Sequence, residues 1–119
     1  MDIRTLQRIV IDALEDIKGK DIEVINTRKL SAMFARIVIV SADSGRQAKA
    51  LARSVQDRVR AAGGLVIGIE GEAVGEWVLV DLGEVVVHIM QPKVRVHYNL
   101  EALWQGTASA ARASVTAEL

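Results

Sequence analysis

The chain has 119 residues, 50% of them hydrophobic and 25% charged, which suits one domain with a single core. Its 15 basic and 15 acidic side chains cancel, so direct, sequence-specific nucleic-acid binding is not expected. The absence of cysteine excludes disulfides, thiol nucleophiles and cysteine zinc sites. The chain start lacks a signal-peptide core and no apolar run is long enough for a membrane span, so we expect a cytoplasmic protein.

The first half of the chain predicts two helices and two strands. Apolar side chains in residues 3–18 recur at spacings of three and four, which predicts a helix. Residues 21–26 predict a strand near a sheet edge, and the β-branched run 35–40 predicts a strand inside the sheet. The polar residues 41–45 offer N-cap oxygens for a second amphipathic helix, which runs to a pair of glycines and carries Arg and Lys on its outer face.

The second half predicts a short strand at 65–69 and then a hairpin. Its strands, 76–81 and 84–90, flank Leu82-Gly83, which predicts a two-residue turn that sets Asp81 opposite Glu84.

A short helical segment is expected to close the domain. Pro92 suits the first position of a helical turn, and Asn99 can cap a last segment that ends near Trp104. The small and polar residues 106–119 predict a flexible tail, so the domain is expected to span 1–105.

Alternation along the hairpin sorts its side chains onto two faces of the sheet. One face is purely aliphatic, as a surface under helices requires, and consists of Val78, Val80, Val85, Val87 and Ile89. The other mixes large apolar groups with charges, and consists of Trp77, Leu79, Asp81, Glu84, Val86, His88 and Met90. Two main helices on one side of about five strands would leave this second face open as an interface. The pattern leaves equally open that the segment around Tyr98 and Trp104 covers it.

No segment carries a recognisable catalytic or metal motif. Asp43-Ser44-Gly45 follows a strand, as phosphate-binding turns do, but lacks the glycine spacing and the lysine of nucleotide loops. A magnesium- and nucleotide-dependent transferase is the alternative to a binding protein, and Asp43 and Asp81 would be its carboxylates. His88 and His97 lack further metal ligands, so no catalytic residue, metal or cofactor is expected.

Segments along most of the chain, in the family's order, resemble the iojap-like ribosomal silencing factors. They are 21–24 leading to Leu30-Ser31, 41–47, 75–88 and 94–104. The sequence departs from the family's pattern before Arg46, where Thr-Gly-Thr-Ser is usual. It also has Leu82 where Tyr is common, Glu84 where Asp is common and Met90 where Phe is common.

The resemblance implies a fold and a function. The fold is a single α/β domain with a mixed, roughly five-stranded sheet and helices mainly on one face, similar to nucleotidyl transferases but without their catalytic carboxylates. The function is not enzymatic: similar proteins bind ribosomal protein fourteen on the large ribosomal subunit, block the small subunit by occupying its place, and lower translation when nutrients are scarce.

Residues on the mixed face of the hairpin are the expected binding site. We expect Trp77 to anchor the partner and two acids to lie at the rim, in a set of Trp77, Leu79, Asp81, Leu82, Glu84, Val86, His88 and Met90. A homodimer through the same face is a further alternative.

Overall fold

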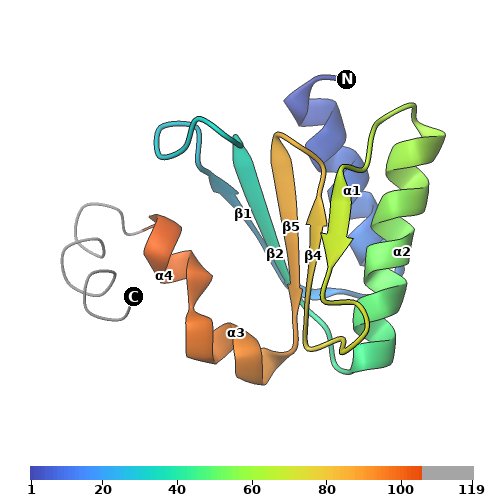
Figure 1. Ribbon diagram of the computed structural model, residues 1–119, viewed down its shortest axis with the longest axis vertical. Coiled ribbons are helices and arrows are strands. Elements are labelled where there is room, and N and C mark those ends of the chain that lie inside the picture. Colours follow the sequence, from blue (N-terminus) through green and yellow to red (C-terminus); the bar gives the residue numbers. More distant parts are fainter. Residues whose placement is uncertain (106–119) are drawn as a thin grey trace.

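The structure is a computed structural model that describes residues 1–105, with the side chains of Trp104 and Gln105 left out; the tail predicted for 106–119 lies outside the described residues. In chain order the elements are α1 (Ile3–Asp16), β1 (Lys20–Asn26), β2 (Arg36–Ser41), α2 (Gly45–Ala61), β3 (Gly68–Glu70), β4 (Trp77–Asp81), β5 (Val85–Met90), α3 (Pro92–Tyr98) and α4 (Leu100–Gln105). They form a five-stranded sheet with helices on both faces (Figure 1).

The strand order is β1-β2-β5-β4-β3, so the last strand of the described residues is the central strand of the sheet. β5 runs parallel to β2, and the other neighbours are antiparallel, which confirms a mixed sheet. The predicted edge position of β1 and interior position of β2 are both confirmed.

The strand predicted at 65–69 begins later than expected. β4 ends at Asp81, which pairs with Gly68, so the residues before Ile67 have no strand beside them. Only the Ile67 N–H still donates to the Asp81 carbonyl, at 2.8 Å.

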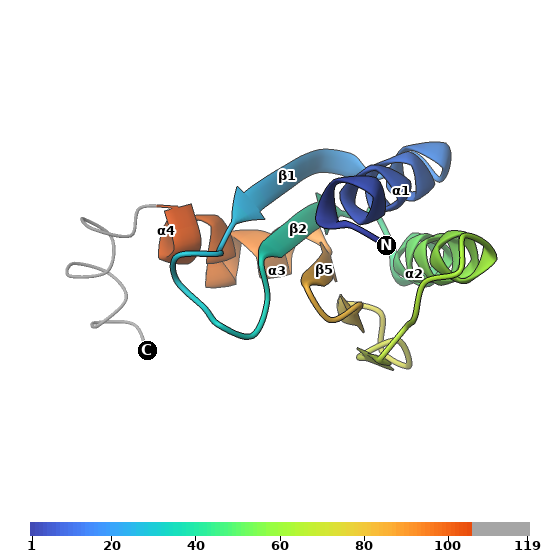
Figure 2. The same ribbon diagram turned by 90° about the horizontal axis from the view of Figure 1, so that it is seen from above.

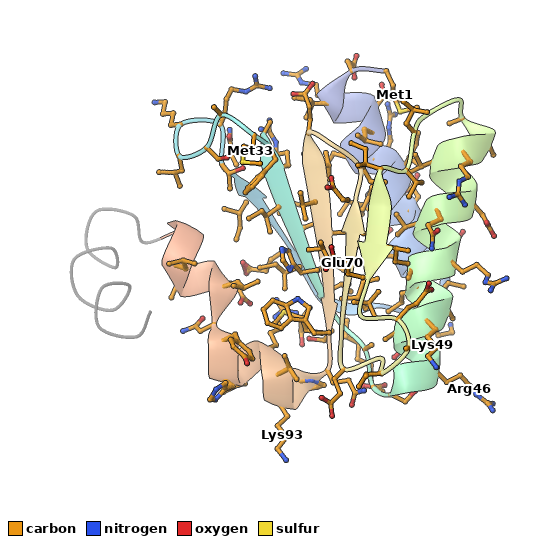
Figure 3. The ribbon with its side chains drawn as sticks, in the orientation of Figure 1. Met1, Met33, Arg46, Lys49, Glu70 and Lys93 are labelled. Atoms are coloured by element: carbon orange, nitrogen blue, oxygen red, sulfur yellow. The ribbon has the colours of Figure 1, made fainter. Side chains whose placement is uncertain are left out.

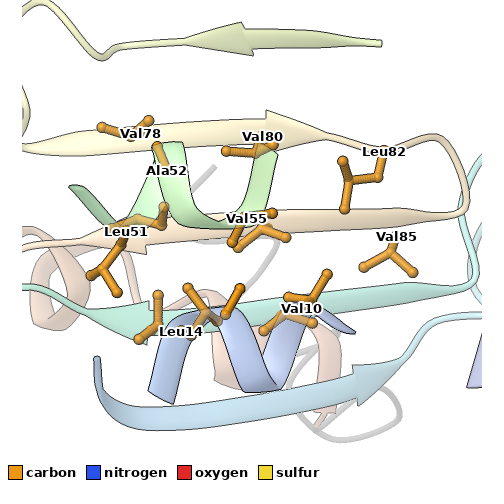
Figure 4. Close-up of a cluster of buried hydrophobic side chains, with 14 of the residues drawn as sticks. Val10, Leu14, Leu51, Ala52, Val55, Val78, Val80, Leu82 and Val85 are labelled. Atoms are coloured by element: carbon orange, nitrogen blue, oxygen red, sulfur yellow. The ribbon is translucent and has the colours of Figure 1, made fainter. Parts of the chain in front are cut away.

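The helix face of the sheet is covered by the two long helices, α1 and α2. Each begins at a side-chain cap: Asp2 accepts from the Thr5 N–H at 2.7 Å, and Ser44 from the Gln47 N–H at 3.1 Å. Figure 4 shows Leu14 and Leu51 of the helices facing the sheet's valines. The five hairpin residues predicted for this face, Val78, Val80, Val85, Val87 and Ile89, are all 0% exposed.

The opposite face of the sheet has a smaller core of its own. Val94 of α3 and Leu100 of α4 pack against a buried cluster of Ile25, Ile37, Ile39 and Met90. Figure 2 shows α3 and α4 on the side of the sheet away from α1 and α2. The prediction of helices mainly on one face therefore holds for the long helices, while two short ones cover part of the other face. Within residues 1–105, no helix is long and apolar enough to span a bilayer.

Candidate functional site

The β4–β5 hairpin is present, but its register differs from the prediction by two residues. Asp81 pairs with Val86 and not with Glu84. Trp77 pairs with Met90, whereas the predicted register would set it opposite His88. The connection between paired strands thus has four residues, and the Leu82 N–H donates to the Val85 carbonyl at 2.9 Å. A shift of two residues preserves the side-chain period, so the predicted division into two faces survives.

Two residues predicted to bind a partner are buried. Leu82 is 6% exposed because the longer turn folds it into the core under α1 and α2, as Figure 4 shows. Met90 is 0% exposed because it lies in the cluster that α3 and α4 cover. The prediction that these two side chains face a partner is therefore wrong.

The other predicted residues stay accessible. Glu84 is exposed at the hairpin turn. Five side chains on the mixed face are half-buried, and we call them the open strip: Trp77, Leu79, Asp81, Val86 and His88. The strip crosses β4 and β5, between the short helices on one side and the edge strand β3 on the other. α3 and α4 leave this mainly apolar part of the face uncovered, except at Trp77, which packs against the cluster beneath them.

Trp77 is held at one end of the open strip by two ring contacts and a hydrogen bond. Its Nε1–H donates to Nδ1 of His88 at 3.0 Å. Its ring lies 4.8 Å from the ring of Tyr98, which extends from α3 and is 54% exposed. The indole is therefore pre-ordered, with its polar edge already satisfied, which lowers the entropy lost when a partner packs against it.

The His88 imidazole is neutral at physiological pH. Burial lowers its pKa from 6.5 to about 4, because the charged form loses solvation. Since Nδ1 accepts the indole proton, the neutral ring carries its own proton on Nε2. His88 thus supports Trp77 and adds no charge to the open strip.

The position of Trp77 also depends on a close backbone approach. Gly71 in the β3–β4 loop has φ +85°, and a Cβ built there would lie 2.1 Å from the Trp77 carbonyl oxygen. A side chain at position 71 would therefore displace the start of β4.

α3 is fastened to the sheet by a nearly buried arginine. Arg95 is 9% exposed; its Nε donates to Oε2 of Glu101 in α4 and its Nη1 to Oγ of Ser41 at the end of β2, both at 2.8 Å. Oε1 of Glu101 is buried and has no hydrogen-bond partner among the described residues. This ion pair joins both short helices to the sheet, and so determines how far the mixed face is covered.

Tyr98 is the site residue that the sequence assignment missed. It lies on Trp77 although twenty-one positions separate them, and only the alternative in which the closing segment covers the sheet anticipated a contact of this kind. That alternative is correct for Met90 and its neighbours and for the Trp77 end of the open strip. It is incorrect for the rest of the strip, which the closing segment does not cover.

The two carboxylates of the transferase alternative are far apart. Asp43 follows Ser41, which lies beside Met90, and Asp81 lies beside Val86. About 13 Å of β5 separates those two ends of the sheet. Asp43 pairs with Lys20 at 2.8 Å, and Asp81 accepts from the Gly83 N–H at 2.8 Å. No group of three or more potential metal-ligating side chains occurs in residues 1–105.

Comparisons with known proteins identify relatives of this chain in both sequence and fold. Residues 1–118 match the family model described as ribosomal silencing factor during starvation. The ribosomal silencing factor of Chromobacterium violaceum is 53% identical over 106 residues, covering 89% of this chain and 87% of the relative. That of Bacillus subtilis is 35% identical over 104 residues, covering 87% and 88%. A crystal structure from Chromobacterium violaceum superposes with a TM-score of 0.87 at 52% identity and covers 88% of each chain.

The fold is thus that of the small α/β proteins with a mixed five-stranded sheet to which these relatives belong. The chain belongs to the ribosomal silencing factor family. Membership implies association with the ribosome and a role in its silencing, which is regulatory and not enzymatic.

Proposed function

We propose that this protein binds the large ribosomal subunit through ribosomal protein fourteen, using the open strip, and thereby blocks the small subunit. The action is steric: a body bound where the subunits meet occupies the place of the other subunit. We place this activity in the cytoplasm, where free subunits would otherwise join, and expect it to lower translation when nutrients are scarce.

The observation that supports this proposal is the pre-ordered Trp77 beside an uncovered apolar surface. Large aromatic side chains at the centre of an interface contribute much of the binding free energy, and apolar neighbours exclude water around them. The open strip has this composition, with Trp77, Leu79 and Val86 half-buried on adjacent strands. Tyr98 extends the surface onto α3, and Asp81 and Glu84 provide acids for basic groups at the rim.

Co-sedimentation with purified large subunits tests the docking surface. Trp77→Ala should weaken binding roughly thirtyfold, since removal of a large aromatic anchor from an interface commonly costs about 2 kcal/mol. Because Trp77 also contacts His88 and Tyr98, a second variant, Leu79→Glu, places a charge in the strip without removing that cluster. It should weaken binding at least tenfold.

A matched control uses the same substitution outside the strip. Leu65 is 80% exposed before β3, so Leu65→Glu should leave binding unchanged. Circular dichroism and thermal melts establish that all three variants fold. If folded Leu79→Glu and Trp77→Ala both sediment with large subunits as the wild type does, the open strip is not the docking surface.

Subunit joining tests the consequence. Wild-type protein added to large subunits should reduce the light scattering that follows addition of small subunits, in proportion to its occupancy. Leu79→Glu should not. A homodimer formed through the open strip would compete with ribosome binding. It predicts that the free protein has the mass of a dimer in solution and that Leu79→Glu has the mass of a monomer.

A further inference from the structure

Positive charge in this chain is concentrated on α2. Its 17 residues contain five basic side chains and one acidic side chain, Asp57. The helix therefore carries a net charge of +4 in a chain whose total is zero, and the remaining residues carry −4. The neutral total conceals this separation.

Four of these basic side chains form a line along the helix, which we call the basic stripe: Arg46, Lys49, Arg53 and Arg60. Their spacings of three, four and seven return to the same side of an α-helix. The line is about 21 Å long at 1.5 Å per residue. All four side chains are exposed, and none forms an ion pair within residues 1–105. The fifth, Arg58, is paired with Asp16.

The basic stripe lies at the β3 edge of the molecule. A groove of about 520 Å³ between α2 and the β3–β4 loop is lined by Lys49, Arg53, Arg60, Gln56, Asp57 and Glu72. Figure 3 shows Arg46 and Lys49 pointing away from the sheet on the outer side of α2. β3 is the three-residue edge strand beside β4. A partner that covers the open strip can therefore continue around this narrow edge to the stripe.

Two acids lie in the groove, and they bear on what the stripe can bind. Asp57 and Glu72 reduce the local charge, but neither approaches a stripe cation within ion-pair distance. Arg53 and Asp57 stand four positions apart, a spacing that favours pairing on a solvated helix, and they are nevertheless unpaired. The donors of the stripe are thus available to an external anion.

We propose that the basic stripe binds the phosphodiester backbone of ribosomal RNA on the large subunit. The inference rests on the proposed function, because it takes the same subunit as the partner and adds a second surface. A line of cations suits a polyanion, and Arg and Lys donors suit phosphate oxygens. α2 contains no aromatic side chain on which a base could stack, so the contact reads the backbone and not the sequence.

The salt dependence of binding tests the number of phosphate contacts. Each contact contributes about 0.7 (single strand) to 0.9 (duplex) to the slope of log K against log salt concentration. Arg53→Gln combined with Arg60→Gln should therefore flatten the slope for large subunits by about 1.4 to 1.8 and weaken binding most at low salt. Arg4→Gln combined with Arg8→Gln removes two exposed charges from α1 and should keep the wild-type slope. Equal slopes for the two double variants would overturn the proposal.

The chemical class of the partner is tested by crosslinking. A photoreactive benzoylphenylalanine in place of Gln56 is activated on purified large subunits, and the products are digested with ribonuclease. Ribonuclease-sensitive adducts are expected, whereas adducts to protein alone would assign the stripe to an acidic protein surface. If Leu79→Glu binds large subunits normally while the double variant of the stripe still flattens the salt dependence, the open strip is not the docking surface and the RNA contact of the basic stripe is supported. If Leu79→Glu loses binding while the stripe variant keeps the wild-type slope, the stripe alone fails.

Discussion

The two faces of the sheet are closed by different means. On the helix face, α1 and α2 bury a continuous aliphatic cluster that includes every inward side chain of the hairpin. On the mixed face, two short helices bury four residues, and one arginine fastens them to the sheet. The remainder, the open strip, is half-buried. The helix face thus supplies most of the stability, and the mixed face keeps apolar surface available for binding.

Truncation of one isoleucine on each face gives the largest expected effect. Ile89 and Ile39 are both 0% exposed, on adjacent strands, and belong to the helix-face and mixed-face clusters respectively. Ile89→Ala should lower the free energy of unfolding by about 4 kcal/mol and Ile39→Ala by about 2–3 kcal/mol, because the smaller cluster has partly exposed neighbours that can relax into the cavity. Urea denaturation measures both. Equal losses would contradict the difference between the faces.

The more buried ion pair, on the mixed face, should contribute more to stability than the exposed ion pair on the helix face. Arg95 and Glu101 have side chains 10% and 21% exposed, whereas those of Arg58 and Asp16 are 43% and 55% exposed. Glu101→Ala leaves a buried guanidinium with Ser41 as its remaining partner and should cost roughly 3 kcal/mol. Asp16→Ala should cost less than about 1 kcal/mol.

Hydrogen exchange distinguishes where the Glu101→Ala loss falls. Protection should decrease in α3 and α4 while α1 and α2 keep theirs, because the pair fastens only the short helices. Loss of protection throughout the sheet would mean that the mixed face is not a separate unit.

Lowering the pH should reduce the folding stability of the protein through His88 on the mixed face. The pKa of His88 is about 4 in the folded protein and 6.5 in the unfolded chain, so unfolding takes up a proton between these values. Stability is therefore complete above pH 6.5 and falls as the pH decreases toward 4. We expect the free energy of unfolding to fall by about 2 kcal/mol over this window, less than the full shift would give because the ring keeps some contact with solvent. His88→Gln should abolish this component in urea titrations at several pH values, and His97→Gln, an exposed change on α3, should retain it.

Local sequence patterns are sufficient to assign the strand residues of the helix face, but not Leu82 in the turn. Alternation in the hairpin identifies Val78, Val80 and Val87 as inward, and a register error of two residues leaves that assignment intact. Ser41 to Gly45 offered several caps, and Ser44 is the one used. The error arose at Leu82, which looked like a turn residue but is drawn into the core by contacts that no local pattern contains.

Coverage of the mixed face could not be predicted in the same way. It depends on Arg95 reaching Ser41 across the sheet and on Tyr98 meeting Trp77, and both contacts are set by where two short helices dock. Segments of seven and six residues are too short for a periodic pattern to show which side faces inward. The sequence predicts the basic outer face of α2, but the zero net charge of the whole chain does not indicate that a local excess of positive charge exists there.

The order of the strands has a consequence for synthesis of the chain. β5 fills the gap between β2 and β4 and pairs Arg36 with Val85, yet of the strands in residues 1–105 it is the last to be translated. Until it leaves the exit tunnel, the nascent chain has two separate antiparallel pairs, and no central strand joins them. The five-stranded sheet can therefore form only after β5 has been made, and a chain released before Val85 would expose two unpaired strand edges.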